Sequence, residues 1–173
     1  MVLRSGVKKS HLWVLIAAIL TLCNNAIIET SIPVPEESID QKEYLISLFN
    51  KDRKGRSLGE IYLDESLNEI AQEHTDYMIT KGYYSHYTQD GRDPSDRARE
   101  ANFTYVVREI IEKGNSIDGV HTYFINNRLN LNIILNSQHT RAGIGINTNP
   151  SGALIVTVLF STRDFENYPY KEE

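Results

Sequence analysis

The chain has 173 residues, of which 40% are hydrophobic and 24% charged, and this balance argues against a chain that is disordered throughout. The formal net charge is −5, and residues 1–28 contain three basic side chains and no acidic one, so the remainder carries 15 basic and 23 acidic side chains. So acidic a domain is not expected to bind nucleic acid or an anionic membrane surface.

Residues 1–28 have the pattern of an export segment. Arg4, Lys8 and Lys9 precede the almost wholly apolar run Leu12–Leu22, and a basic start before about 7–15 apolar residues is typical of a signal peptide. A full membrane span needs about 20 apolar residues, so the segment is expected to be either a cleaved signal peptide or an N-terminal membrane anchor. Both alternatives predict an extracellular domain, which is secreted or held at the cell membrane through this segment.

The remainder is expected to form one domain. Residues 29–37 contain two prolines and no helical periodicity, which is typical of an extended spacer. The domain is expected over residues 38–163, with a polar tail over residues 164–173. Because Cys23 is the one cysteine of the chain, this domain has no disulfide and depends on its buried core for stability.

Helical periodicity dominates the first half of the domain. Capping residues and apolar spacing predict three helices, with these limits: Ser38 to Gly55, Asp64 to Gly82, and Asp93 or Pro94 to about Ala101. His74 lies on the apolar face of the second helix. We therefore interpret it as a buried, hydrogen-bonded histidine rather than as part of a site.

Strands and one helix alternate in the second half. The expected elements are a strand over Thr104–Ile111, a helix over Ile117–Arg128, and strands over Ala142–Thr148 and Ala153–Ser161. The last two strands should pair as an antiparallel hairpin around the turn at residues 149–152. The fold class is therefore α+β, a three-layer α-β-α sandwich with a small, mainly antiparallel central sheet.

The predicted helix over Ile117–Arg128 places Val120, Tyr123, Phe124 and Asn127 on one face. The Asn-rich run Asn126–Asn136 is expected either to line a polar groove or to form a hydrogen-bonded loop. His121 and His139 lie away from any expected cleft, so both are predicted to face solvent.

The stretch around His86 has the composition of a site. Tyr83, Tyr84 and Ser85 precede His86, and a polar Asp-Gly turn follows it. A histidine between aromatic residues and a polar turn is expected to be held by packing on one side and open to a cleft on the other. Neighbouring residues of an extended chain point in opposite directions, so a catalytic pair of Ser85 with His86 is not expected.

Several motifs, in order, resemble the CAP superfamily of cysteine-rich secretory proteins, antigen five and pathogenesis-related proteins. They are the Tyr-Tyr-Ser-His sequence at 83–86, the DGRDPSDRAREANF sequence at 90–103 and the RAGIGI sequence at 141–146. The resemblance runs from about Leu45 to Phe160 and is to the prokaryotic type without disulfides. It implies the same three-layer fold.

The resemblance also implies the residues of a ligand-binding cleft. His86 matches the histidine that follows the aromatic residues, and Glu109 matches the family's cleft glutamate, although the residues beside it differ from the usual glycine and asparagine. Asn130 stands where the second histidine is usual, and Asn127 is the nearest counterpart of a further glutamate. Two structural alternatives stay open from the residues themselves. Glu109 could pair with Arg97 or Arg108, and Asp96 could pair with Arg97 across a helix start.

The departure at Asn130 lowers the expectation of a metal. A neutral amide is a poor zinc ligand and cannot act as a base. We therefore expect no cofactor, and a divalent metal, if one is present, would be held by His86 and Glu109. No nucleophile motif such as G-x-S-x-G or H-E-x-x-H occurs in the sequence.

The predicted function is that of a non-enzymatic extracellular module. Through the cleft around His86 and Glu109 it would bind a lipid, a small hydrophobic ligand or a component of the cell envelope, ligand classes that the resemblance implies. One alternative is a hydrolase, protease-like, that uses His86 and Glu109 with or without a metal. Another is a structural module of the cell envelope that contacts a partner protein.

Overall fold

The computed structural model describes residues 40–162, which form five helices and one four-stranded sheet. The predicted export segment over residues 1–28, the spacer over 29–37 and the tail over 164–173 lie outside the described residues. Between residues 40 and 162, none of the helices combines the length and the apolar character that crossing a membrane requires.

Capping side chains set the limits of the first three helices. Helix α2, Gln41–Lys54, begins after Asp40, whose carboxylate accepts from the Lys42 N–H, so the prediction of Ser38 as the N-cap was wrong. Helix α3, Glu65–Lys81, begins after Asp64 and ends at a left-handed Gly82, as predicted. Helix α4, Pro94–Glu100, follows a reciprocal cap between Asp93 and Asp96.

The second half contains three strands and two helices. Strands β3, Arg141–Thr148, and β4, Leu154–Ser161, form the predicted antiparallel hairpin. Strand β2, Val107–Gly114, lies three residues later than predicted, because its register with β4 pairs Val107 with Ser161 and Gly114 with Leu154. The ladder on β4, rather than the run of β-branched residues, sets its limits.

Two short elements were not predicted. The expected helix ends early, as α5 over Ile117–Asn126, and a separate helix α6 follows over Arg128–Ile134. The Asn-rich run is therefore mostly helical, and Asn127 caps the start of α6. Strand β1, Tyr62–Leu63, pairs in parallel with the beginning of β3.

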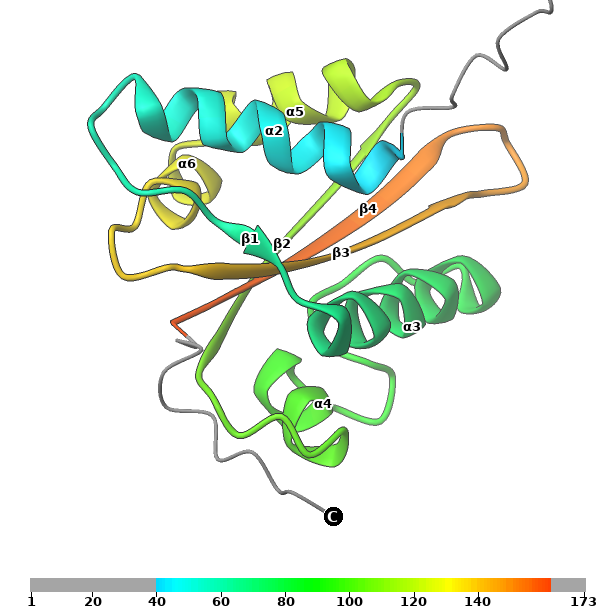
Figure 1. Cartoon of the computed structure of the whole chain (residues 1–173). Helices are drawn as coiled ribbons and strands as arrows, with labels where there is room; N and C mark the ends of the chain where they lie inside the picture. Colours follow the sequence, from blue (N-terminus) through cyan, green and yellow to red (C-terminus); the bar gives the residue numbers. More distant parts are fainter. Residues whose placement is uncertain (1–39, 163–173) are drawn as a thin grey trace, which may run out of the picture. The chain divides into compact units, whose positions relative to one another are not determined.

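The sheet has the order β1-β3-β4-β2 and is covered by helices on both faces. Figure 1 shows α2, α5 and α6 above the sheet and α3 and α4 below it. Two of the three strand pairings are antiparallel and the pairing of β1 with β3 is parallel. The three-layer α+β prediction is confirmed, with a sheet that is mixed rather than purely antiparallel.

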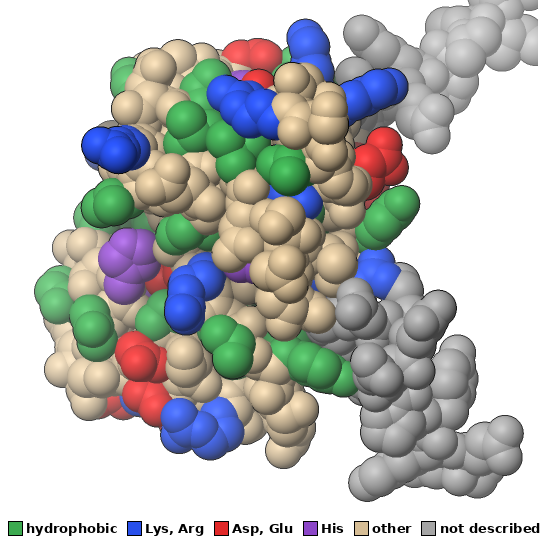
Figure 2. Space-filling model, turned by 90° about the vertical axis from the view of Figure 1, so that its left-hand side faces the viewer, with side chains coloured by type: hydrophobic (Ala, Val, Ile, Leu, Met, Phe, Trp, Pro, Cys, Tyr) green, Lys and Arg blue, Asp and Glu red, His purple; other side chains and the backbone are tan. Residues whose placement is uncertain are grey.

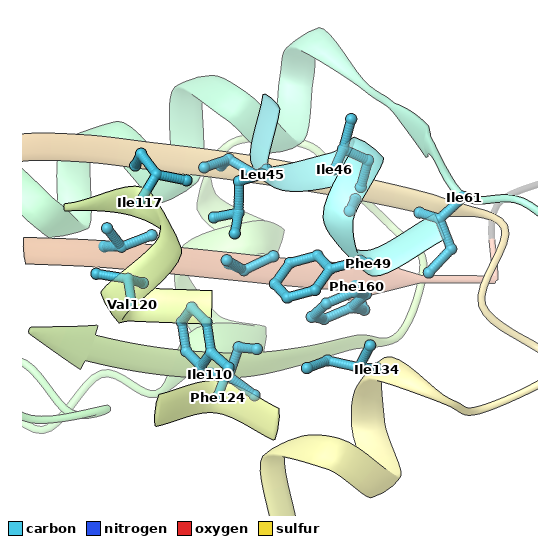
Figure 3. Packing of buried hydrophobic residues seen from close by; sticks show 14 residues of the cluster. Leu45, Ile46, Phe49, Ile61, Ile110, Ile117, Val120, Phe124, Ile134 and Phe160 are labelled. Carbon is cyan, nitrogen blue, oxygen red and sulfur yellow. The ribbon is translucent and has the colours of Figure 1, made fainter. Parts of the chain in front are cut away.

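Each face of the sheet has its own hydrophobic core. The upper core lies between the sheet and α2, α5 and α6, and in Figure 3 Phe49, Phe124 and Phe160 meet near its centre. The ring centroid of Phe49 lies 5.9 Å from that of Phe124 and 5.9 Å from that of Phe160. The lower core lies against α3 and α4 and includes Leu67 and Ala98.

Of the residues expected on one face of α5, Val120 and Phe124 are buried and Tyr123 is 56% exposed. The prediction that His121 and His139 face solvent was wrong. His139 is buried, with its ring stacked on Phe160 at 5.5 Å and its Nδ1 2.9 Å from the Ile133 carbonyl. His121 is largely covered because its Nε2 lies 2.7 Å from a carboxylate oxygen of Asp52 on α2.

Candidate functional site

His86 and Glu109 meet at the lower face of the sheet. His86 lies in the loop between α3 and α4, and Glu109 lies on β2. The His86 Nδ1 is 2.9 Å from the Glu109 Oε1, and the two side chains are 54% and 1% exposed. The sheet therefore presents a buried carboxylate that holds the ring of an exposed histidine.

The second carboxylate oxygen of Glu109 accepts from Arg97, one of the two arginines considered for this role. Arg97, on α4, also donates from Nη1 to the His86 carbonyl at 2.9 Å. The expected pair of Asp96 with Arg97 was wrong, since Asp96 instead binds Arg99 at 2.9 Å. Arg97 thus fixes the Glu109 carboxylate, which orients the His86 ring, and it also fixes the backbone of His86.

His74 fixes the same loop from α3. Its ring is buried, and because a carbonyl can only accept, its Nε2 donates to the Ser85 carbonyl at 2.9 Å. Burial lowers the pKa of His74, as expected for an imidazole removed from water. The interpretation of His74 as a buried, hydrogen-bonded histidine agrees with this contact.

A cleft of about 370 Å³ opens beside His86. Its lining consists of one segment of the α3–α4 loop, one segment of β2 and one residue of β4: Tyr84, Ser85, His86, Ile111, Glu112, Lys113 and Ile155. Burial raises the pKa of Glu112 above that of an ordinary glutamate. The sequence reasoning did not single out Glu112, although it follows Glu109 by three positions on the same strand.

The chemistry available in this cleft is limited. Ser85 Oγ accepts a hydrogen bond from the Tyr87 N–H at 3.0 Å, so it is held in its own loop. Within residues 40–162, no three side chains of His, Cys, Asp or Glu come together in a way that could hold a metal ion. The remaining groups are the His86 imidazole, which binds the Arg97-paired Glu109 carboxylate, the half-buried carboxyl group of Glu112, and the aromatic ring of Tyr84.

Comparison with family models matches residues 46–160 to CAP, the cysteine-rich secretory protein family. The chain belongs to this family. No curated protein matches the chain.

Solved structures share the CAP fold with this domain. An outer surface protein from Borrelia burgdorferi has a TM-score of 0.66 at 21% identity, over 72% of this chain and 93% of its own. An extracellular SCP-domain protein from Bacillus anthracis has a TM-score of 0.61 at 22% identity, over 70% of this chain and 40% of its own. A cysteine-rich secretory protein from Staphylococcus aureus has a TM-score of 0.59 at 18% identity, over 75% and 41%.

The other two predicted site residues, Asn130 and Asn127, have hydrogen-bond partners other than His86. Asn130, on α6, donates from Nδ2 to a carboxylate oxygen of Glu112 at 3.3 Å. Asn127 uses its Oδ1 to accept from the N–H groups of Leu129 and Asn130, at 2.9 and 3.4 Å. Successive side chains of a strand face opposite sides of the sheet, so Glu109 faces His86 while Glu112 faces α6.

Proposed function

We propose that this CAP domain acts outside the cell and binds a ligand, without catalysis, in the cleft beside His86. The observation that carries the proposal is the occupation of both Glu109 carboxylate oxygens by Arg97 and His86. A general base needs a free oxygen within hydrogen-bond reach of the proton that it removes. Glu109 is arranged to position His86 and not to activate a water.

The lining of the cleft favours a partly apolar ligand. Ile111 and Ile155 supply apolar surface and Tyr84 an exposed aromatic ring, while His86 and Glu112 add a few polar groups. Ligand pockets combine apolar walls with a small number of placed polar groups. A lipid, a small hydrophobic ligand or a fragment of the cell envelope fits this description.

The charge of the chain argues against nucleic acid as a partner, because 23 acidic residues outnumber 18 basic ones. Figure 2 shows a face on which basic and acidic side chains are scattered among hydrophobic ones, and neither sign forms a continuous field. Nucleic-acid binding requires a concentrated basic surface. The extracellular location rests on the export pattern of residues 1–28, and the fold-level likeness to outer-surface and extracellular proteins agrees with it.

The test is a titration of the full, ¹⁵N-labelled chain with sodium palmitate and, separately, with a soluble peptidoglycan fragment. Binding in the cleft should shift the amide signals of residues 84–86 and 111–113. His86→Ala should weaken that binding at least tenfold while the domain stays folded, because Arg97 still binds the buried Glu109 carboxylate. Tyr123→Ala, which removes an exposed tyrosine on α5, is the matched control and should bind normally.

If the unchanged chain and His86→Ala bind these probes with equal affinity, His86 is not part of the binding site. If the amide shifts are confined to other surfaces, the cleft is not the binding site, and a structural envelope module is favoured.

A hydrolase remains the second candidate because of one geometric feature. The Nδ1 of His86 faces a carboxylate, as in a histidine that a carboxylate orients for proton transfer. The purified chain should then cleave casein or an ester substrate, with loss of turnover in His86→Ala. Absence of turnover with and without EDTA would remove this candidate.

A further inference from the structure

Strand β2 forms one edge of the sheet. The order β1-β3-β4-β2 leaves it with β4 as its neighbour on one side. Within residues 40–162, no backbone hydrogen bond joins β2 to a further segment on its other side. The outward N–H and C=O groups of β2 therefore have no strand to pair with in the described part of the chain.

The opposite side of the sheet is treated differently. Beyond its short pairing with β1, strand β3 meets side chains of α3 that replace a neighbouring strand. Asn68 Oδ1 accepts from the Ile144 N–H at 2.8 Å, and Gln72 accepts from the Ile146 N–H and donates to its C=O, each at 3.1 Å. This fold covers one free edge with helix side chains and leaves the other one open.

The cleft beside His86 lies on that open edge. It is lined by three consecutive residues of β2, Ile111, Glu112 and Lys113. Because successive side chains alternate between the two faces, a cavity that contacts all three must reach the edge of the strand. Its other wall is the segment Tyr84–His86, so the cleft is a trench between the edge of β2 and this segment.

The backbone groups that face the trench follow from the pairing. The Ile144 N–H of β3 binds a side chain of α3 and so points away from β4. Its partner Val158 on β4 therefore turns its N–H and C=O toward Ile110 of β2. Lys113 lies an odd number of positions from Ile110, so its N–H and C=O point away from β4. In an antiparallel ladder, the residues that point outward alternate with those that bind the partner strand. The N–H and C=O of Ile111 therefore also point away from β4 and into the trench.

We propose that the ligand of this cleft is an extended peptide, which adds to the sheet as a further strand along Ile111–Lys113. The inference rests on the proposed function, because it names the ligand class of the same cleft. A row of N–H and C=O groups at strand spacing is matched by another polypeptide backbone, the mode known as strand addition. An apolar side chain of the peptide would lie against Ile155 and Tyr84.

The charged side chains of Lys113 and Glu112 are consistent with an edge strand that is kept available for a peptide. Charged side chains on an edge strand keep it from pairing with other exposed edges, and both side chains also line the trench. The ammonium of Lys113 lies 6.0 Å from the ring centre of Tyr84, at the rim of the trench. An acidic residue in the peptide would complement it.

The experiment uses an array of acetylated octapeptide amides with alternating apolar and polar positions, probed with the full chain. The strongest peptide is then titrated in solution against ¹⁵N-labelled protein. We expect shifts at residues 84–86 and 111–113. N-methylation of those alternate peptide amides that face β2 should weaken binding at least tenfold, whereas N-methylation of the intervening amides should change it less than threefold.

Three results would overturn the inference: no binding peptide in the array, amide shifts away from β2, or equal sensitivity to N-methylation at every position. Ile111→Pro, which removes one outward N–H, should also abolish peptide binding, with Ile111→Val as the conservative control. The N-methyl series uses the unchanged protein, so a failure of Ile111→Pro to fold does not affect it.

The outcome also separates this inference from the proposed function. Palmitate or the peptidoglycan fragment in the cleft, with dependence on His86 and no peptide binding, would overturn the inference alone. Peptide binding at β2 that is unchanged in His86→Ala would support strand addition and remove the proposed role of His86.

Discussion

Glu109 is a buried carboxylate whose two oxygens face two different cationic or titratable side chains. Arg97 approaches from α4 and His86 from the loop before it. Removing one partner of a buried pair leaves the other charge without compensation, and this is more damaging than the net contribution of the intact pair. The site and the lower layer of the fold therefore depend on the same contact.

Arg97→Ala should lower the free energy of unfolding by about 3–5 kcal/mol, because it leaves the Glu109 carboxylate buried and half paired. Urea denaturation at neutral pH measures this change. Arg99→Ala is the matched control, since Arg99 lies on the same helix with an exposed side chain and binds Asp96. A loss in Arg97→Ala no larger than that in Arg99→Ala would contradict the role assigned to the buried pair.

Acid should weaken the domain through His74. Burial is the largest cause of its lowered pKa, the charge of Arg97 lowers it further, and the charge of Glu109 raises it. A histidine with a lowered pKa in the folded state is neutral in both states above its ordinary pKa of about 6.5. Below that pH the unfolded chain binds a proton that the folded chain does not, so stability falls as pH decreases.

Unfolding free energies at pH 7.5 and 5.5 test this sign. The loss on acidification should be smaller in His74→Gln, whose amide can still donate to the Ser85 carbonyl. His139, whose pKa burial also lowers, stays in both proteins and keeps part of the effect. An identical loss in both proteins would show that His74 does not contribute.

At the scale of elements, α3 lies directly on β3 because of two glycines. A Cβ at Gly143 would lie 2.0 Å from the Leu67 carbonyl carbon, and one at Gly145 would lie 2.3 Å from the Ala71 oxygen. Only the absence of a side chain allows this approach. The glycines also bring Asn68 and Gln72 within hydrogen-bond reach of β3.

Gly143→Ala should therefore lower the free energy of unfolding by about 1–3 kcal/mol through displacement of α3. Thermal or urea unfolding gives the value. A Cβ at Gly59 would meet nothing within 4 Å, so Gly59→Ala should be neutral. Equal behaviour of the two variants would mean that the helix can move away without loss.

Arg53 joins α2 to the end of α6. It is buried and donates to four carbonyls, those of Gly59, Ile134, Asn136 and His139, at 2.7–3.2 Å. Burial lowers its pKa, but a guanidinium remains charged in proteins. The Ile134 carbonyl belongs to the last residue of α6, where a helix favours a cation.

Arg53→Met keeps the length of the side chain and removes every donor. Because unpaired buried acceptors are unfavourable, the free energy of unfolding should fall by about 3 kcal/mol or more in urea denaturation. Arg56→Met removes an exposed arginine that donates to the Asp52 carbonyl, and it should have little effect. A small loss for Arg53→Met would indicate that water reaches these carbonyls.

In the whole domain, both cores pack against the same four-stranded sheet. Unfolding of one helical layer would therefore expose the sheet on which the other layer also depends. The described residues should unfold as one cooperative unit. Tyr123→Trp reports on α5 above the sheet, and Tyr105→Trp reports on the lower core, against which Tyr105 packs. Their fluorescence transitions in urea, after subtraction of the native tryptophan signal, should have the same midpoint. Separate midpoints would show two independent layers.

Much of the fold could be predicted because the signals are local. Asp64 and Gly82 limit α3 as predicted, since a side-chain cap and a left-handed glycine depend on few neighbours. The alternation of Ile144 and Ile146 with glycines and the apolar run of β4 predicted the hairpin. Composition and ordered motifs were enough for the three-layer class.

Other features depend on partners that are distant in sequence. The limits of β2 come from its ladder with β4, and the two residues of β1 form a strand only because β3 lies beside them. His139 is buried by Phe160, and Glu112 enters the cleft through its place on β2 opposite Tyr84–His86. No periodicity near these residues indicates such contacts.

The sequence by itself determined the class of the domain and most of its helices, and it indicated His86 and Glu109 as candidate cleft residues. Caps, hydrophobic spacing and motifs act over a few positions, so they can be recognised without the fold. Only the tertiary structure decided that Arg97 neutralises Glu109, that Asn130 contacts Glu112 and that the cleft follows the free edge of β2. These are relations between chain segments that lie 12 to 23 residues apart or at the border of a sheet. Packing sets them, and packing is a property of the folded whole.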